Sequence, residues 1–150
     1  MEVSYYKSPI GVLEIVCEKN ALISLKLVKD AENHNDETVL ISVIKRQLDE
    51  YFCGERKTFD IKINPKGTEF QKKVWNELQK IPYGVTKSYS EIADAMGNKN
   101  AQRAVGSACN KNHIMIIIPC HRVISKTGKS GGFAYGSSIK QKLLDIEVEL

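Results

Sequence analysis

Three short apolar runs, separated by turn-forming residues, open the chain. From Val3 to Val28 the sequence is rich in Val, Ile, Leu and Tyr, and it is interrupted at Ser8–Gly11 and at Lys19–Asn20. Runs of this length and composition, bounded by Gly, Pro and Asn, are typical of strands joined by tight turns. The pattern predicts a small antiparallel meander.

A helical pattern follows the polar loop at 30–36. From Glu37 onward, apolar residues recur at the spacing of one helix face, and Gly54 is a plausible end of that helix. These residues are Leu40, Val43, Ile44, Leu48, Tyr51 and Phe52. Apolar and polar residues then alternate over 59–63, as in a short strand. We therefore expect an α+β domain over residues 1–63, whose sequence carries no chemical motif.

Asn64–Gly67 is the clearest boundary in the chain, because it combines Pro and Gly with polar residues. Thr68 and Gln71 follow it at the spacing of a capping box, which predicts the start of a helix. The apolar face of this helix comprises Phe70, Val74, Trp75 and Leu78. The helix should end before Pro82, because a residue that precedes proline avoids α geometry. A second, mostly helical domain is expected over residues 64–150.

Two further short helices are predicted after Ser88. Ser88 and Glu91 form a second capping box, Gly97 ends the first helix, and a new helix can begin after Asn100. From the second helix Ala101, Ala104, Val105 and Ala108 would face inward, and Gln102 and Arg103 outward. The pair fits a helix-turn-helix that binds DNA, although an ordinary helical hairpin has the same pattern.

Composition limits the class of protein. A chain of 150 residues can bury a core without disulfides. Its four cysteines are widely spaced and lack zinc-site spacing, so we expect free thiols and no metal. The N-terminus lacks the apolar segment of a signal peptide, and no later segment approaches the length of a membrane span. We expect a soluble, cytoplasmic protein that makes no membrane contact.

The charge of the chain is unevenly distributed. The net charge is +4, but residues 1–63 hold 9 Lys and Arg against 11 Asp and Glu, a net charge of −2, which leaves +6 for residues 64–150. A basic excess confined to one half favours a polyanionic partner for that half. A solvated basic face is the alternative.

Cys120 and His121 place a thiol beside a base, directly after the apolar run 114–118. A free thiol is mostly protonated at neutral pH, so a nucleophilic Cys120 needs a base or a positive field nearby. Adjacent residues generally point in different directions, so we expect His121 to act through a water molecule, with a carboxylate orienting its ring. Glu147 is a reasonable partner, and Asp145 and Glu149 remain open. A packed cysteine beside a surface histidine is the structural alternative.

Several separated motifs of the C-terminal half resemble those of one family. They are Tyr89, Arg103–Gly106, Asn112, Ile118–Val123 and Lys140-x-x-Leu143-Leu144-x-x-Glu147. In order and spacing they resemble the O6-alkylguanine-DNA alkyltransferases over residues 65–148, whereas over 1–64 only the general strand-and-helix pattern agrees. The resemblance implies a ribonuclease H-like N-terminal domain and a C-terminal domain with a helix-turn-helix. Homologues with tryptophan in place of Cys120 bind damage without removing it, so Cys120 indicates the repairing class.

The resemblance implies DNA repair by irreversible transfer of an alkyl group to Cys120, from O6 of guanine and also from O4 of thymine. The helix-turn-helix would enter the minor groove of double-stranded DNA, and Arg103 would replace the flipped nucleotide in the stack. Because a thioether is a poor leaving group, each molecule would react once. The reaction needs no metal or organic cofactor, and we expect a monomer.

The resemblance also assigns roles to the side chains around the cysteine. His121 would deprotonate the thiol through water, Glu147 would orient His121, and Asn112 would hold the turn that presents the thiol. Tyr89 would donate to N3 of the leaving guanine, and Lys140 would polarise the site. DNA contacts are expected from Ser88, Ala101, Gln102, Arg103 and Arg122, and walls of the substrate pocket from Val123, Phe133, Ala134 and Tyr135.

One segment departs from the family pattern. The family usually has tyrosine, a small residue and two glycines where this chain has Phe133-Ala134-Tyr135-Gly136. Tyr135 adds bulk where glycine usually leaves space, so the pocket should accept O6-methylguanine and take large adducts such as benzyl less readily. His113 and Met115 stand where prolines are common, which suggests a less rigid segment before Cys120.

Two other classes of function fit parts of the sequence. A regulatory DNA-binding protein would use the same two helices without any chemistry. A cysteine hydrolase acting on small acyl substrates would use the thiol and the base without DNA. Each site residue also has a structural alternative: Asn112 can cap a turn, Tyr89 can be a half-buried core residue, and Arg103 can be a surface helix charge.

Overall fold

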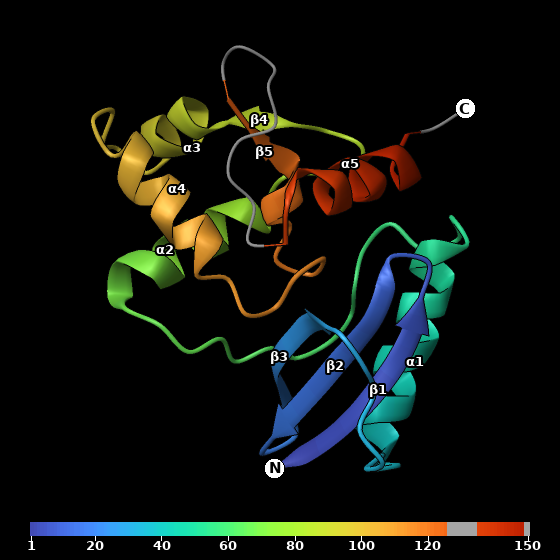
Figure 1. Cartoon of the computed structure of the whole chain (residues 1–150). Helices are drawn as coiled ribbons and strands as arrows, with labels where there is room; N and C mark the ends of the chain where they lie inside the picture. The colour runs from blue at the N-terminus through green and yellow to red at the C-terminus, as the bar shows by residue number, and fades with distance from the viewer. Residues whose placement is uncertain (126–134, 149–150) are drawn as a thin grey trace. The chain divides into compact units, whose positions relative to one another are not determined.

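Two units make up the chain, Met1–Lys66 and Gly67–Leu150, and the computed structural model describes residues 1–125 and 135–148 (Figure 1). The first unit holds a three-stranded antiparallel sheet and one helix, and the second holds mostly helices. The predicted α+β class is thereby confirmed.

The first unit begins with the predicted meander. Strands β1 (Glu2–Ser8), β2 (Gly11–Glu18) and β3 (Ala21–Val28) are antiparallel and lie in that order. Lys19 and Asn20 form the second turn with φ angles of 51° and 60°. The first turn relies on Gly11, whose φ of 129° favours glycine. The interruptions seen in the sequence are therefore the turns of the sheet.

Helix α1 (Val39–Phe52) lies along this sheet (Figure 1). Thr38 caps its N-terminus by accepting a hydrogen bond of 3.2 Å from the backbone N–H of Ile41. Gly54 follows the helix with a φ of 77°, as the sequence predicted for its end. The core between helix and sheet comprises Leu13, Ile15, Leu22, Leu25, Ile41, Ile44 and Leu48.

The prediction of a strand over 59–63 is wrong in its extent. Only Ile63 pairs with the sheet, through a single parallel bridge to Leu22. Both backbone groups of Asp60 bind the buried side chain of Gln47 instead, at 2.9 Å and 3.2 Å. Because the backbone bonds of Asp60 go to a side chain, they are not available for a strand ladder.

The second unit begins with helix α2 (Glu69–Leu78). Thr68 and Gln71 form the predicted capping box, with hydrogen bonds of 3.1 Å and 2.9 Å in opposite directions. The inner face of α2 buries Val74, Trp75 and Leu78. The indole N–H of Trp75 donates to the carbonyl of Ala108 at 2.9 Å, so α2 is bonded to the helix that carries Ala108.

Helices α3 (Tyr89–Ala95) and α4 (Gln102–Asn110) pack against each other and are joined by a turn that contains Gly97 (Figure 1). Ser88 and Glu91 form the second predicted capping box at the start of α3. Ala101, Val105 and Ala108 face inward, whereas Ala104 is exposed, contrary to expectation. Ala104 adjoins the exposed Arg103 and so belongs to the outer side of α4.

Short segments complete the second unit. Strands β4 (Lys87–Ser88) and β5 (Val123–Ile124) form a parallel pair, which places the start of α3 beside the residues that follow the single turn η1 (Cys120–Arg122). Helix α5 (Ser137–Ile146) packs against η1. Among the described residues, every helix is too short or too polar to cross a membrane.

Candidate active site

The apolar run before Cys120 folds into two consecutive tight turns. A backbone hydrogen bond of 2.8 Å closes a three-residue turn around Ile116, and a second of 2.8 Å closes another around Pro119. The φ of Ile116 is 73°, a conformation that costs a β-branched residue about 1–3 kcal/mol. Neighbouring contacts must therefore hold this loop in place.

Asn112 makes three of those contacts. Its Oδ1 accepts a hydrogen bond of 2.9 Å from the backbone N–H of Ile114, and its Nδ2 donates to the carbonyl of Ile118 at 2.8 Å. Nδ2 also donates to Sγ of Cys120 at 3.1 Å. One buried side chain thus bonds both to the loop and to the thiol that the loop presents.

Cys120 is 3% exposed, and burial continues through Val123 instead of ending at the apolar run. Burial raises the pKa of the Cys120 thiol well above its ordinary value, and the neighbouring thiol of Cys109 raises it further. Asn112 and Lys140 oppose this increase. At neutral pH the resting thiol is therefore protonated and needs a base to become a nucleophile.

His121 and Glu147 are in direct contact. Nε2 of His121 lies 2.6 Å from Oε2 of Glu147, and both side chains are buried. Because a carboxylate only accepts, Nε2 carries the proton, and in the neutral ring Nδ1 has the lone pair. Among the described residues Nδ1 is buried without a hydrogen-bond partner. Burial lowers the pKa of His121, although Glu147 opposes this, so the ring is neutral near pH 7 and can accept a proton at Nδ1.

The other two acids considered from the sequence take different positions. Asp145 is exposed and accepts a hydrogen bond of 2.9 Å from Gln141. Glu149 lies outside the described residues.

Arg122 differs from the expectation that it contacts DNA. It is 7% exposed, its Nε donates to Oε1 of Glu147 at 2.7 Å, and its Nη2 donates to Oε2 at 3.1 Å. Nη1 donates to the carbonyl of Ile81 at 2.8 Å, and the guanidinium lies 5.9 Å above the ring of Tyr83. The charged group is directed into the protein, so the predicted DNA contact is not supported.

Lys140 and Tyr89 lie on another side of the thiol. Lys140 is fully buried, its Nζ donates to the carbonyl of Val123 at 2.5 Å, and it lies 5.8 Å above the Tyr89 ring. Burial lowers the pKa of Lys140, whereas Cys109 and Cys120 raise it. Burial, followed by the same two cysteines, raises the pKa of Tyr89 to about 12. Tyr89 therefore keeps its hydroxyl proton and can donate it in a hydrogen bond.

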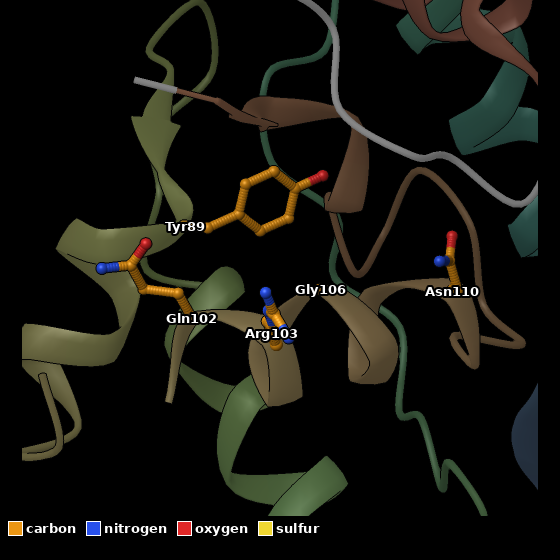
Figure 2. A pocket seen from close by; sticks show the side chains of 5 residues that line it. All are labelled: Tyr89, Gln102, Arg103, Gly106 and Asn110. Carbon is orange, nitrogen blue, oxygen red and sulfur yellow. The ribbon is translucent and has the colours of Figure 1, made fainter. Parts of the chain in front are cut away.

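A pocket of about 220 Å³ opens beside Tyr89, lined also by Gln102, Arg103, Gly106 and Asn110. Figure 2 shows the Tyr89 ring above the side chains of α4, with Gln102 and Asn110 to either side of Arg103. Gln102 and Arg103 are exposed, as the helical pattern predicted. The pocket therefore lies between Tyr89 and the outer side of α4.

Two other predicted DNA contacts have buried side chains. Ala101 is 7% exposed and stands at the N-terminal cap of α4. Ser88 is 7% exposed, and its hydroxyl accepts a hydrogen bond of 3.1 Å from the backbone N–H of Glu91. The Ser88 hydroxyl is therefore engaged in capping α3.

The predicted pocket wall is described in part. Val123 is fully buried in β5. Tyr135 is half-buried, and its pKa is raised by burial and by the charge of Cys120, which places it near the thiol. Phe133 and Ala134 lie outside the described residues.

Sequence reasoning missed two groups of the site. The thiol of Cys109, eleven positions before Cys120, is buried and contributes to the raised pKa of the Cys120 thiol. The backbone N–H of Gly84 donates to Oε1 of Glu147 at 3.3 Å. The helical spacing of Cys109 with Val105 could have indicated the first, because both face the interior of α4. Among the described residues no group of three metal-ligating side chains is present.

Two family models match adjacent parts of this chain. The ribonuclease-like domain of 6-O-methylguanine DNA methyltransferase matches residues 1–65, and the DNA-binding domain of the same proteins matches residues 69–149. The chain belongs to the 6-O-methylguanine DNA methyltransferase family. The resemblance carried by the C-terminal motifs is confirmed, and membership of the methyltransferase family extends over the N-terminal unit as well.

Relatives of known name are similar over nearly the whole length. The methylated-DNA--protein-cysteine methyltransferase of Methanosarcina acetivorans is 45% identical, covering 98% of this chain and 98% of its own. The constitutive enzyme of that name from Bacillus subtilis is 41% identical, covering 96% and 95%. The crystal structure of Mycobacterium tuberculosis OGT in complex with DNA is 40% identical with a TM-score of 0.90, covering 98% of this chain and 92% of that one. This methyltransferase thus shares its fold with a relative captured on DNA.

Proposed function

We propose that this methyltransferase repairs DNA by transferring an alkyl group, typically methyl, from O6 of guanine to Sγ of Cys120. The observation that carries the proposal is a buried thiol bonded to Asn112 at 3.1 Å, next to a His121–Glu147 pair joined at 2.6 Å. The names of the relatives, which act on methylated DNA through a cysteine, support the same reaction.

In the proposed reaction Cys120 gives its proton, through a water molecule, to Nδ1 of His121. Glu147 accepts from Nε2–H and stabilises the positive ring, while Arg122 favours the ionised form of Glu147. Lys140 lowers the pKa of the Cys120 thiol and so favours the thiolate. These groups compensate for the burial that otherwise keeps the thiol protonated.

The thiolate then attacks the alkyl carbon in line with its bond to O6. An S–C bond forms, the C–O bond breaks, and the electron pair passes to the guanine ring. Tyr89, with a pKa of about 12, donates a hydrogen bond to ring N3 as this negative charge develops. Because the product is a thioether, which is a poor leaving group, each molecule reacts once. O4 of alkylated thymine presents the same type of bond and is the second substrate.

The outer side of α4 supplies the DNA contact. Arg103 and Gln102 are exposed and line the pocket beside Tyr89. We infer that α3 and α4 bind double-stranded DNA as a helix-turn-helix in the minor groove, and that Arg103 fills the gap left by a flipped nucleotide. The small side chain of the exposed Ala104 allows the DNA backbone to approach α4 closely. We infer that the protein acts as a monomer.

A titration of the DNA product tests this function. Protein is mixed with increasing amounts of a duplex that contains O6-methylguanine, and restored guanine is counted. The product should stop at one equivalent per protein molecule, and Cys120→Ala should bind the duplex without restoring any guanine. Multiple turnovers would favour a hydrolase or another catalyst. Tight, operator-specific binding without product would favour a regulator.

A further inference from the structure

Cys109 is a buried thiol beside the alkyl acceptor that the proposed reaction does not use. It is 4% exposed and lies near the end of α4, and Cys120 is 3% exposed in η1. Asn112 connects the two residues, because its backbone N–H donates to the Cys109 carbonyl at 3.3 Å and its Nδ2 donates to Sγ of Cys120 at 3.1 Å. The two cysteines are thus held on either side of one residue.

The same groups surround both thiols. Cys109 and Cys120 both raise the pKa of Lys140 and the pKa of Tyr89, which they do when they are ionised. The thiol of Cys109 also raises the pKa of the Cys120 thiol, as expected for a neighbouring acidic group. A second thiol next to a nucleophilic cysteine is the arrangement that converts a sulfenic acid into a disulfide. The other two cysteines, Cys17 and Cys53, belong to the first unit.

We propose that Cys109 is the resolving thiol for oxidation of Cys120, so that a peroxide converts the pair into a disulfide that reversibly withdraws the alkyl acceptor. The thiolate of Cys120 first attacks one peroxide oxygen, which breaks the O–O bond and gives a sulfenic acid and hydroxide. Sγ of Cys109 then attacks the sulfenic sulfur, the S–S bond forms, and the hydroxyl leaves as water with the Cys109 proton. The two thiols lose two electrons, and the peroxide is reduced to two molecules of water.

The consequence is protection of the acceptor. Without a resolving thiol, a sulfenic acid can be oxidised further to sulfinic acid, which thiol reductants do not reverse. A disulfide can be reduced back to two thiols. Peroxide access to Cys120 rests on the proposed function, because a thiol that accepts an alkyl group from DNA must be reachable when the site is in use.

The test uses the full chain and hydrogen peroxide. Trypsin separates the two cysteines into the peptides Ala104–Lys111 and Asn112–Arg122, because Lys111 lies between them. Protein is treated with peroxide, remaining thiols are blocked, and the digest is analysed by mass spectrometry. The expected product is the linked pair of peptides, two hydrogens lighter than their sum. Alkyl acceptance should be lost as this product accumulates and should return after reduction with dithiothreitol.

Matched variants decide the outcome. Cys109→Ala should give no linked peptide, should accumulate sulfinic acid on Cys120, and should not regain alkyl acceptance on reduction. Cys53→Ser should behave like the wild type, because the exposed Cys53 plays no part. Cys109→Ser provides a second variant if the alanine variant is unstable. Sulfinic acid on Cys120 in the wild type, at the same rate as in Cys109→Ala and without a linked peptide, would overturn the proposal. Because the linked peptide is detected without DNA, its absence is distinct from a failure of alkyl transfer.

Discussion

Arg122 binds both carboxylate oxygens of Glu147, with Nε 2.7 Å from Oε1 and Nη2 3.1 Å from Oε2. Removing one partner of a buried charge pair leaves the other charge without compensation, which costs about 3–5 kcal/mol. Arg122→Met should therefore lower the free energy of unfolding by about that amount in urea titrations. Arg46→Met, at an exposed arginine of α1, is the matched control and should change it little.

The same pair predicts non-additive effects. In Arg122→Met/Glu147→Gln the buried carboxylate is neutralised, so the double variant should be more stable than the sum of the two single losses predicts. Additive losses in this double-mutant cycle would show that Arg122 stabilises the fold independently of Glu147.

The pH dependence of the alkyl-transfer rate should show whether His121 accepts the proton of Cys120. Burial lowers the pKa of His121 below 6.5 and raises that of Cys120. Between these two pKa values the fraction of molecules holding a thiolate and an imidazolium does not change with pH. The single-turnover rate should therefore be level from about pH 7 to about pH 8.5, and should fall only below about 6.5, when the ring is already protonated.

A variant without the imidazole gives the contrast. In His121→Gln the rate should depend on the thiolate alone and rise about tenfold per pH unit over the same range. A wild-type rate that rises in the same way would mean that Cys120 ionises without His121.

Arg103 should matter more for duplex DNA than for a free base. If Arg103 occupies the place of a flipped nucleotide, its removal leaves an unstacking cost of a few kcal/mol uncompensated. Arg103→Ala should slow transfer from a duplex by about a hundredfold, while leaving the reaction with free O6-benzylguanine nearly unchanged. Gln102→Ala, at the neighbouring exposed position of the same pocket, should have a smaller effect. Equal losses on both substrates would place Arg103 in the chemistry instead.

Tyr135 should limit the size of the alkyl group. It is half-buried near the Cys120 thiol, at a position where the family usually has glycine. Tyr135→Gly should accelerate transfer of benzyl much more than transfer of methyl, as measured by single-turnover rates on duplexes carrying each adduct. If the wild type transfers both at comparable rates, and the variant does not change their ratio, Tyr135 does not restrict the pocket.

Local signals explain what could be predicted from the sequence. The capping boxes at Thr68 and Ser88 fixed the starts of α2 and α3, because the bonds that define them span only three residues. Cys120 was identified from its place beside His121 after an apolar run, and Asn112 through a likeness of motifs; the contact between Asn112 and Cys120 spans eight positions.

Long-range partners explain what could not be predicted. The resemblance placed Arg122 among the DNA contacts, but its partner Glu147 lies 25 positions away, and no local pattern indicates that pairing. The backbone groups of Asp60 hydrogen-bond with the side chain of Gln47 instead of pairing in a strand. The alternation of apolar and polar residues gives no sign of this contact. The closeness of Cys109 to Cys120 likewise depends on how the loop after α4 folds.

The most direct test of the central claim is the mass of the peptide Asn112–Arg122 after one equivalent of a duplex containing O6-methylguanine has reacted. This peptide should gain one CH₂, fragmentation should place the added group on Cys120, and the peptide Ala104–Lys111 should be unchanged. The reaction with Cys120→Ala should leave every peptide at its original mass. Restored guanine in the DNA while the Cys120 peptide of the wild type stays unmodified would show that Cys120 is not the alkyl acceptor.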